Sequence, residues 1–195
     1  MILDEYFSDA KRVLSDSYSP QQELTFEASL ACIMKSVTLG GKILVCGNGG
    51  SHADSLHFAG ELVNYFTRPH RAIPVIALGS NSAVLTAWAN DHTYETQFER
   101  EVEAFGDSRS VLIGFSTSGK SLNVINAFKK AKSIGMKNIA FTGLTGSKLL
   151  YDFVDHVLFA STDVTPRVQE THIVMYHALC AEFENRYQLL EEKLR

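Results

Sequence analysis

Short apolar runs alternate with longer amphipathic segments along most of the chain, and this alternation predicts strands and helices in turn. Five runs bounded by glycine, proline or polar residues are typical of buried strands. They are KILVC at 42–46, AIPVIAL at 72–78, SVLIGFS at 110–116, NIAFTG at 138–143 and HVLFAS at 156–161. Pro74 places the second strand near a sheet edge or at a strand end, because proline lacks the N–H that a ladder needs.

Apolar residues at helical spacing predict the remaining elements. Pro20 separates two N-terminal helices, Ser51 is expected to cap the helix that follows the first strand, and Gly135 closes a later one. The predicted helices span 2–16, 21–38, 51–66, 82–89, 93–104 and 121–135, with one long helix from about Arg167 onward.

Strands that alternate with helices indicate right-handed crossovers and a parallel sheet. We therefore expect an α/β fold with a doubly wound, parallel five-stranded sheet flanked by helices. The length of 195 residues suits a single domain over 1–195. Residues 1–39 form an N-terminal helical extension, for which we expect a role in oligomerisation, and a long helix ends the chain.

Composition and charge argue against nucleic-acid-binding, membrane-spanning and secreted proteins. A net charge of −4 gives no electrostatic footprint for nucleic acid, and no apolar stretch approaches membrane-spanning length. The start, MILDEYFSDAKR, lacks the layout of a signal peptide. Cys32, Cys46 and Cys180 form no CxxC pair and indicate buried thiols in a reducing compartment. We expect a cytoplasmic protein without nucleic-acid or membrane partners.

Two polar loops follow predicted strands and each opens a helix. NGGSH (48–52) follows the first strand, and STSGKS (116–121) follows the third. Ligands of doubly wound sheets bind at the carboxyl ends of strands, and helix N-termini favour anions. The two loops therefore predict a phosphate site.

The second loop also fits a different nucleotide-binding motif. Residues 114–121, GFSTSGKS, match the P-loop pattern GxxxxGK[ST] between a strand and a helix. Three features count against it. Gly114 lies where the strand should still continue, no later strand ends in a magnesium-binding Asp, and the NGGSH loop would have no purpose.

Histidines and a carboxylate near the first loop suggest proton transfer or a metal. His57 and Glu61 lie four residues apart on one predicted helix, and His177 lies in the apolar stretch VMYHALC. Taken alone, an i,i+4 pair is most often a surface ion pair, and a lone apolar-face histidine is usually a core residue. Their occurrence beside two phosphate loops favours a functional role.

Four segments together resemble the sedoheptulose-7-phosphate isomerases, or phosphoheptose isomerases, of the sugar isomerase (SIS) domains. They are CGNGGSHADSLHFAGEL, ANDHTYE, GFSTSGKSLNVINAFKKAKSIGM and RVQETHIVMYHAL, in the family's order and spacing over about residues 40–185. The resemblance implies a flavodoxin-like SIS fold, a homotetramer and the interconversion of D-sedoheptulose 7-phosphate and D-glycero-D-manno-heptose 7-phosphate. This reaction is the first step of bacterial ADP- or GDP-heptose synthesis for lipopolysaccharide or other surface glycans.

The resemblance also implies roles for individual residues. The phosphate-binding hydroxyls are Ser51, Ser116, Thr117, Ser118 and Ser121. The groups that line the sugar are Asn48, Gly49, Gly50, Asn90 and Asp91, joined by Glu61 and Gln169. The zinc-associated set, expected to hold one ion per subunit, is His57, Glu61, Gln169 and His177. Glu61 and His177 are the implied acid–base pair.

An aldose–ketose isomerase needs these residue types. It moves a proton between adjacent carbons through an enediol, which requires a positioned base and an acid or cation where charge grows on oxygen. Glu61 suits the first task, and His177 or a zinc Lewis acid suits the second. A carboxylate fully engaged by zinc is a poorer base, so the sequence leaves open which residue moves the proton.

The spacing of Gln169 and His177 raises a geometric problem. The two residues are eight apart, which on a continuous helix is about 12 Å of rise, too far for one small ion. Either the helix begins after Gln169, or the site gathers ligands from more than one subunit. The second alternative makes the oligomer a requirement for activity.

Two departures from the family pattern and one rival function remain. Lys120 stands where asparagine is common, and Pro166 stands where some members carry aspartate; both bear on substrate preference. The rival is a non-catalytic SIS protein that binds a partner of the replication-initiator type. Such proteins lack the acid–base pair, so the presence of Glu61 and His177 favours an enzyme.

Overall fold

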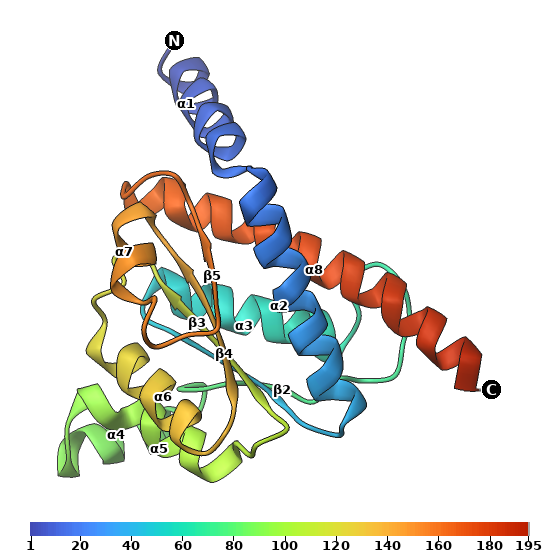
Figure 1. Cartoon of the computed structure of the whole chain (residues 1–195). Helices are drawn as coiled ribbons and strands as arrows, with labels where there is room; N and C mark the ends of the chain where they lie inside the picture. The colour runs from blue at the N-terminus through green and yellow to red at the C-terminus, as the bar shows by residue number, and fades with distance from the viewer. Residues whose placement is uncertain (195) are drawn as a thin grey trace.

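A parallel five-stranded sheet forms the centre of the computed structural model, which describes residues 1–194 (Figure 1). The strands are β1 (Ile43–Gly47), β2 (Val75–Ala77), β3 (Val111–Ser116), β4 (Lys137–Thr142) and β5 (His156–Phe159). Their spatial order is β2-β1-β3-β4-β5, which confirms the doubly wound sheet. β2 lies at an edge directly after Pro74, as predicted. Every residue of β1 and β3 is buried, which explains their uninterrupted apolar sequence.

The helices follow the predicted order, with one addition and several shifted ends. They are α1 (Ile2–Ser17), α2 (Pro20–Thr38), α3 (Gly50–Val63), α4 (Ser82–Asp91), α5 (Gln97–Phe105), α6 (Leu122–Ser133), α7 (Leu144–Leu149) and α8 (Thr165–Leu194), with a 3₁₀ turn, η1, at Tyr94–Thr96. The Ser19 side chain caps α2 by accepting a hydrogen bond from the Gln22 N–H.

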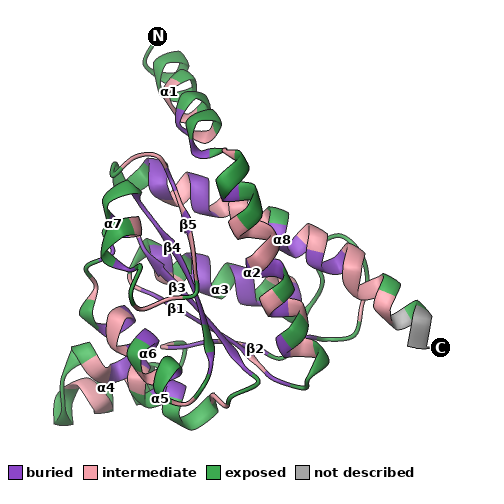
Figure 2. Ribbon diagram, in the orientation of Figure 1, coloured by how far each residue is buried: buried purple, intermediate pink, exposed green. Residues whose placement is uncertain are grey.

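Two hydrophobic cores lie on the two faces of the sheet, and β1 contributes to both. Val45 points into a core with Phe58 of α3 and side chains of α2 and α8. Leu44 points to the opposite core, with Phe128 of α6 and side chains of α5. The strands are accordingly buried between two helical layers (Figure 2). This alternation follows from the twofold side-chain period of a strand.

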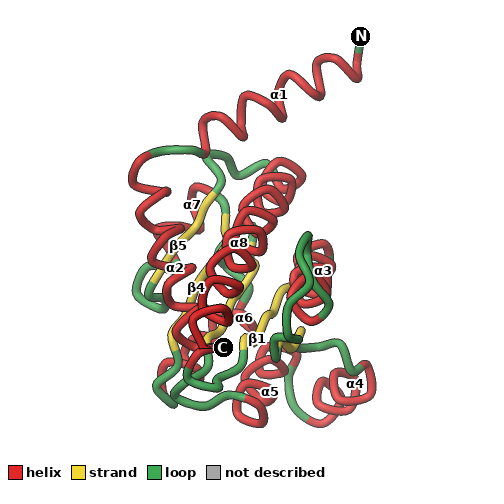
Figure 3. The backbone as a smooth tube through the Cα atoms, turned by 90° about the vertical axis from the view of Figure 1, so that its right-hand side faces the viewer, coloured by secondary structure: helices red, strands yellow, loops and turns green. Residues whose placement is uncertain are grey.

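Helix α1 projects away from this body (Figures 1 and 3). Only Val13 and Ser17 of α1 are buried in the described chain, while Ile2, Leu3 and Phe7 are exposed. Its midpoint is tied to α8 by Arg167, whose Nε donates to Asp9 at 2.7 Å. Exposed apolar side chains on an amphipathic helix that is anchored to the body are suited to packing against another protein surface.

The structure corrects three local expectations. Ser51 does not cap α3, because the helix begins at Gly50 and the cap position is Gly49, with a φ of 55°. The helix expected over 93–104 is divided into η1 and α5. Helix α7 was not predicted at all. Its first turn is held by Asp163, which accepts hydrogen bonds from the N–H and hydroxyl of Thr145.

The sheet order reverses at β1, because the chain passes from β1 to β2 on one side and then to β3 on the other. This reversal opens a crevice at the carboxyl ends of β1 and β3, where doubly wound folds bind ligands. Within residues 1–194, no helix combines the length and apolar character that crossing a membrane would need.

Candidate active site

The loop after β1 turns sharply into α3. Gly49 has a positive φ, and a Cβ on Gly47 would lie 2.4 Å from the Ser51 carbonyl oxygen, so the turn leaves no room for side chains there. The first turn of α3 therefore presents its free N–H groups at the crevice. Ser51 lies in this first turn and is nearly fully buried.

The loop after β3 lies next to it, because Gly47 and Phe115 are paired on adjacent strands. The Ser116 hydroxyl donates to Ser121 Oγ at 3.1 Å, and Ser118 Oγ accepts from the Lys120 N–H. Gly119 has a φ of 67°, and a Cβ there would lie 2.5 Å from the Cα of Gly146. Backbone contact therefore holds this hydroxyl-rich loop in place.

A hollow of about 240 Å³ opens beside this loop. Its lining residues are Thr117, Ser118, Lys120, Thr145, Asp163 and Thr165. The hydroxyl groups and the Lys120 ammonium suit an anion, whereas the Asp163 carboxylate, which accepts a hydrogen bond from the Thr145 hydroxyl, opposes one. Of the predicted phosphate residues after β3, Thr117 and Ser118 line this hollow, whereas Ser116 and Ser121 do not.

The geometry excludes the P-loop alternative. Gly114 lies inside β3, paired with Cys46 on β1 and Ala140 on β4. A Cβ on Gly114 would lie 2.3 Å from Cζ of Phe128, so this glycine serves helix packing rather than a loop. The pattern GxxxxGKS therefore includes three strand residues and does not form a phosphate-wrapping loop.

Asn48 is held by two residues that the sequence reading missed. The side-chain amides of Asn48 and Asn123 exchange hydrogen bonds of 2.8 Å in both directions, and the Tyr94 hydroxyl donates to Asn48 Oδ1 at 2.7 Å. Asn123 is 2% exposed and lies in the first turn of α6. The sequence signal for Asn123 is an amide side chain two residues after the STSGKS loop.

Asn90 and Asp91 lie apart from these loops, at the end of α4. They are exposed and bonded to each other, with the Asn90 amide donating to Asp91 Oδ1 at 2.8 Å. No residue of α4 is buried by the rest of the described chain. Their expected contact with sugar stays a prediction.

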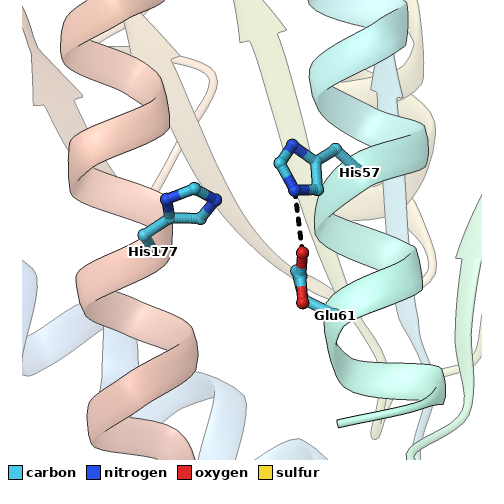
Figure 4. A group of neighbouring side chains, drawn as sticks. All are labelled: His57, Glu61 and His177. Carbon is cyan, nitrogen blue, oxygen red and sulfur yellow. Dashed lines mark hydrogen bonds and ion pairs between the residues drawn. The ribbon is translucent and has the colours of Figure 1, made fainter. Parts of the chain in front are cut away.

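His57, Glu61 and His177 come together between α3 and α8 (Figure 4). One ligand atom from each lies within 4.8 Å of the other two, and His57 Nε2 is 2.8 Å from Glu61 Oε1. The three residues belong to one chain, so Glu61 and His177 meet without help from a second subunit. Their side chains stay open to solvent, with His57 46% and Glu61 23% exposed.

The surroundings of His177 favour its neutral form. Burial lowers the pKa of His177, the nearby His57 lowers it further, and Glu61 opposes both. The ring packs against Phe66 with centroids 5.1 Å apart. Its Nε2 is buried and has no hydrogen-bond partner among the described residues. A neutral imidazole whose buried nitrogen has no hydrogen-bond partner can bind a metal ion or transfer a proton.

Two further groups that the sequence reading missed surround His57. The Tyr176 hydroxyl lies 2.8 Å from His57 Nδ1, and burial raises the pKa of that phenol. Burial also raises the pKa of Asp54 to about 6, against the opposing effect of His57. Neither residue belongs to a motif that marks function in sequence.

Gln169 lies elsewhere on α8. A Cβ on Gly50 would lie 2.1 Å from Gln169 Nε2, so the glutamine covers the start of α3. Helix α8 is continuous from Thr165, which confirms the long helix expected from about Arg167 and excludes the alternative of a helix that begins after Gln169. Gln169 can therefore be a metal ligand only under the remaining alternative, in which subunits share an ion.

The three clustered residues fit a zinc ion. Two imidazoles and one carboxylate are a common zinc set that leaves a fourth position for water or substrate. Ligands of a tetrahedral zinc lie roughly 3.4 Å apart at bond lengths near 2.1 Å, so the cluster needs only small side-chain rotations. The unpaired His177 nitrogen supports this fit.

Comparisons with known proteins identify the family of the chain. An SIS domain family model matches residues 5–143. The phosphoheptose isomerase of Crocosphaera subtropica is 43% identical over 171 residues, 88% of this chain and 87% of that protein. That of Thermodesulfovibrio yellowstonii is 49% identical over 153 residues, 78% of this chain and 76% of that protein. The phosphoheptose isomerase structure from Neisseria gonorrhoeae has a TM-score of 0.85 at 33% identity, covering 94% of this chain and 97% of that one.

Proposed function

The chain belongs to the SIS domain family and, within it, to the phosphoheptose isomerases, and we propose that it converts D-sedoheptulose 7-phosphate to D-glycero-D-manno-heptose 7-phosphate. The observation that carries the proposal is the His57–Glu61–His177 cluster in a chain that also has two phosphate loops. A partner-binding SIS protein has no need of such a cluster.

The phosphate end of the substrate is assigned to the crevice at β1 and β3. Ser51, Ser116, Thr117, Ser118 and Ser121 supply hydroxyl groups, and the starts of α3 and α6 supply backbone N–H groups. A phosphate dianion gains from both the hydrogen bonds and the positive helix ends. Asn48, Gly49 and Gly50 are then placed to contact the sugar that extends from it.

Proton transfer is assigned to Glu61 and His177. Glu61 removes the carbon-bound proton, and His177 donates to the oxygen on which charge develops, which gives the enediol that both sugars share. Reprotonation at the neighbouring carbon completes the isomerisation. A zinc ion bound by His57, Glu61 and His177 would supply Lewis acidity at the same oxygen.

The distance along α3 supports a site shared between subunits in a homotetramer. Glu61 lies eleven residues after Gly50, about 16 Å of helix rise. An extended sugar with bonds of about 1.5 Å reaches only roughly 9 Å from carbon 2 to a phosphate on carbon 7. A substrate anchored in the crevice of one chain therefore meets the cluster of another more readily than its own.

Exposed elements fit the same arrangement. Ile2, Leu3 and Phe7 of α1 are exposed, no residue of α4 is fully buried in the described chain, and α4 carries Asn90 and Asp91. We assign residues 1–39 to subunit contacts, and place the reaction in the cytoplasm at the start of heptose synthesis. One zinc ion per subunit, with Gln169 from a neighbouring subunit as an added ligand, completes the proposal.

A coupled assay with sedoheptulose 7-phosphate tests the function directly. Protein freed of metal with a chelator is compared with the same protein after zinc is added back. Turnover that rises with zinc supports the isomerase and its metal. Binding of the sugar phosphate without turnover in either form would favour the partner-binding alternative.

A further inference from the structure

Tyr176 occupies an unusual position for a polar side chain. It is fully buried on α8, immediately before His177. Its ring packs edge-on against Phe58 and Phe115 in the core, with centroids 6.1 and 5.9 Å away. Its hydroxyl nevertheless emerges at the edge of that core, 2.8 Å from Nδ1 of His57. A phenylalanine could make the same ring contacts, so the hydroxyl requires its own explanation.

Both ring nitrogens of His57 are engaged, by different kinds of partner. Nε2 lies 2.8 Å from a carboxylate oxygen of Glu61, and Nδ1 lies 2.8 Å from the Tyr176 hydroxyl. An ionised carboxylate only accepts, so Nε2 carries the proton and Nδ1 accepts from Tyr176. A cation at Nε2 reverses this pattern, because the lone pair is then needed there and the proton resides on Nδ1.

A phenol can serve both arrangements, because its oxygen donates one hydrogen bond and accepts others. A carboxylate or carbonyl at this place would accept only and would hold His57 in one tautomer. A phenylalanine would remove the protein partner that Nδ1 has here, whichever tautomer were present. Among these alternatives, the hydroxyl alone pairs with His57 both before and after a cation binds.

We propose that Tyr176 is a positioning residue of the metal site, whose hydroxyl reverses its hydrogen bond to His57 when a cation binds at the His57–Glu61–His177 cluster. Tyr176 thereby fixes the ring orientation of His57 and supports the tautomer that each state requires. The hydrogen-bond reversal depends only on cation binding, while its effect on turnover rests on the proposed isomerase function.

The direct test compares Tyr176→Phe with wild type in zinc affinity and in nitrogen-15 NMR spectra of His57. Thr171→Val is the matched control, because it removes another buried hydroxyl of α8 that bonds only the Arg167 carbonyl. Zinc, titrated against a competing chelator, should bind Tyr176→Phe about 10- to 100-fold more weakly, the effect of losing a partner of a metal-bound histidine. Thr171→Val should bind zinc as wild type does.

The NMR spectra report the reversal itself. In wild type, zinc should move the His57 proton from Nε2 to Nδ1 and produce a slowly exchanging Nδ1–H signal. Tyr176→Phe should lose that protection and shift the Nδ1 resonance of the metal-free protein. Unchanged Nδ1 resonances and unchanged zinc affinity in Tyr176→Phe would overturn the proposal.

A double-mutant cycle guards against a general packing defect. In a His57→Asn background, Tyr176→Phe should have no further effect on zinc affinity if the hydroxyl acts through His57. An equal loss in both backgrounds would show that Tyr176 contributes packing alone. This comparison stays informative even if Tyr176→Phe lowers the stability of the fold.

Kinetics separate this inference from the proposed function. In an active isomerase, Tyr176→Phe should lower kcat about ten-fold or more and leave KM for the sugar phosphate near its original value, since the phosphate loops are untouched. Wild-type protein without isomerase activity, but with the NMR reversal, would refute the function and retain the inference. If the wild type is an active isomerase and Tyr176→Phe keeps its kcat and zinc affinity, the proposed function stands and the inference about Tyr176 is refuted.

Discussion

The phosphate crevice and the His57–Glu61–His177 cluster are built in contrasting ways. The crevice is made of backbone turns at the ends of β1 and β3, with glycines at positive φ and close main-chain contacts. The cluster is made of side chains on the neighbouring helices α3 and α8 and remains partly open to solvent. The loops of the crevice hold one another by contacts within one chain, whereas the cluster has an imidazole nitrogen that no described residue hydrogen-bonds.

This difference separates anchoring from chemistry. Phosphate binding needs N–H groups and hydroxyls in a fixed arrangement, and loops at the sheet reversal of a doubly wound fold can supply them. Proton transfer needs side chains whose protonation and metal binding can change, and rotatable groups on helix faces allow that. We therefore expect crevice mutations to change binding and cluster mutations to change turnover.

The largest expected effect is at Glu61. Glu61→Gln keeps the size of the side chain and an oxygen but removes the base, so turnover should fall at least ~100-fold, with little change in substrate affinity. Glu182→Gln is the control, because Glu182 is another partly exposed carboxylate, on α8, that pairs with Arg186 and is not part of the cluster. His177→Ala should abolish turnover as well and lower the zinc content.

Solvent deuterium exchange decides the role of Glu61. If Glu61→Gln still exchanges substrate protons with deuterated solvent at the normal rate, another group is the base. Asp91 is then the next candidate, and Glu61 keeps only its place in the metal set.

Mutations in the crevice should weaken substrate binding rather than slow turnover. Ser118→Ala combined with Ser121→Ala removes two hydroxyls from the β3 loop, and hydrogen bonds to a charged group contribute about 1.5–3 kcal/mol each. Calorimetry should show at least roughly ten-fold weaker sugar-phosphate binding. Ser133→Ala, at the far end of α6, should bind normally. Unchanged affinity in the double variant would remove the loop from the phosphate site.

Mixing subunits tests whether crevice and cluster act across an interface. Each chain of the Ser118→Ala, Ser121→Ala variant retains its cluster, and each Glu61→Gln chain retains its crevice. In randomly mixed oligomers, a shared site should recover about a quarter of wild-type activity, because that fraction of sites combines two intact halves. Heterotetramers that stay inactive would place both halves in one chain.

The smallest expected effects are on stability, at one glycine of the crevice and one glycine beside the cluster. Gly119→Ala should lower the free energy of unfolding by roughly 2 kcal/mol, because its positive φ and the contact with Gly146 both disfavour a Cβ. Gly60→Ala, beside Glu61 on α3, meets nothing within 4 Å and should raise it by about 0.5–1 kcal/mol. Denaturant unfolding measures both, and a destabilised Gly60→Ala oligomer would reveal a partner packed on α3.

Much of the anchoring region could be read from sequence, because its signals are local. The apolar runs before NGGSH and STSGKS predicted β1 and β3, and their polar loops predicted the crevice. The edge position of β2 followed from Pro74 alone. Prediction from local sequence failed where a residue distant in sequence stabilises an element. Asp163 holds the start of α7 from eighteen positions away, and no pattern within 144–149 shows it.

The sequence by itself determined the order of the strands and of the helices other than α7, the sheet class and the residue types available for chemistry, since these depend on periodicity and on neighbours along the chain. Only the tertiary structure decided that His57 and Glu61 face His177, that Asn123 and Tyr94 hold Asn48, and that Tyr176 reaches His57. Each of these contacts joins side chains far apart in sequence. The packing of α3 and α6 against their neighbours sets such distances, and it depends on the shapes of the two cores rather than on any local motif.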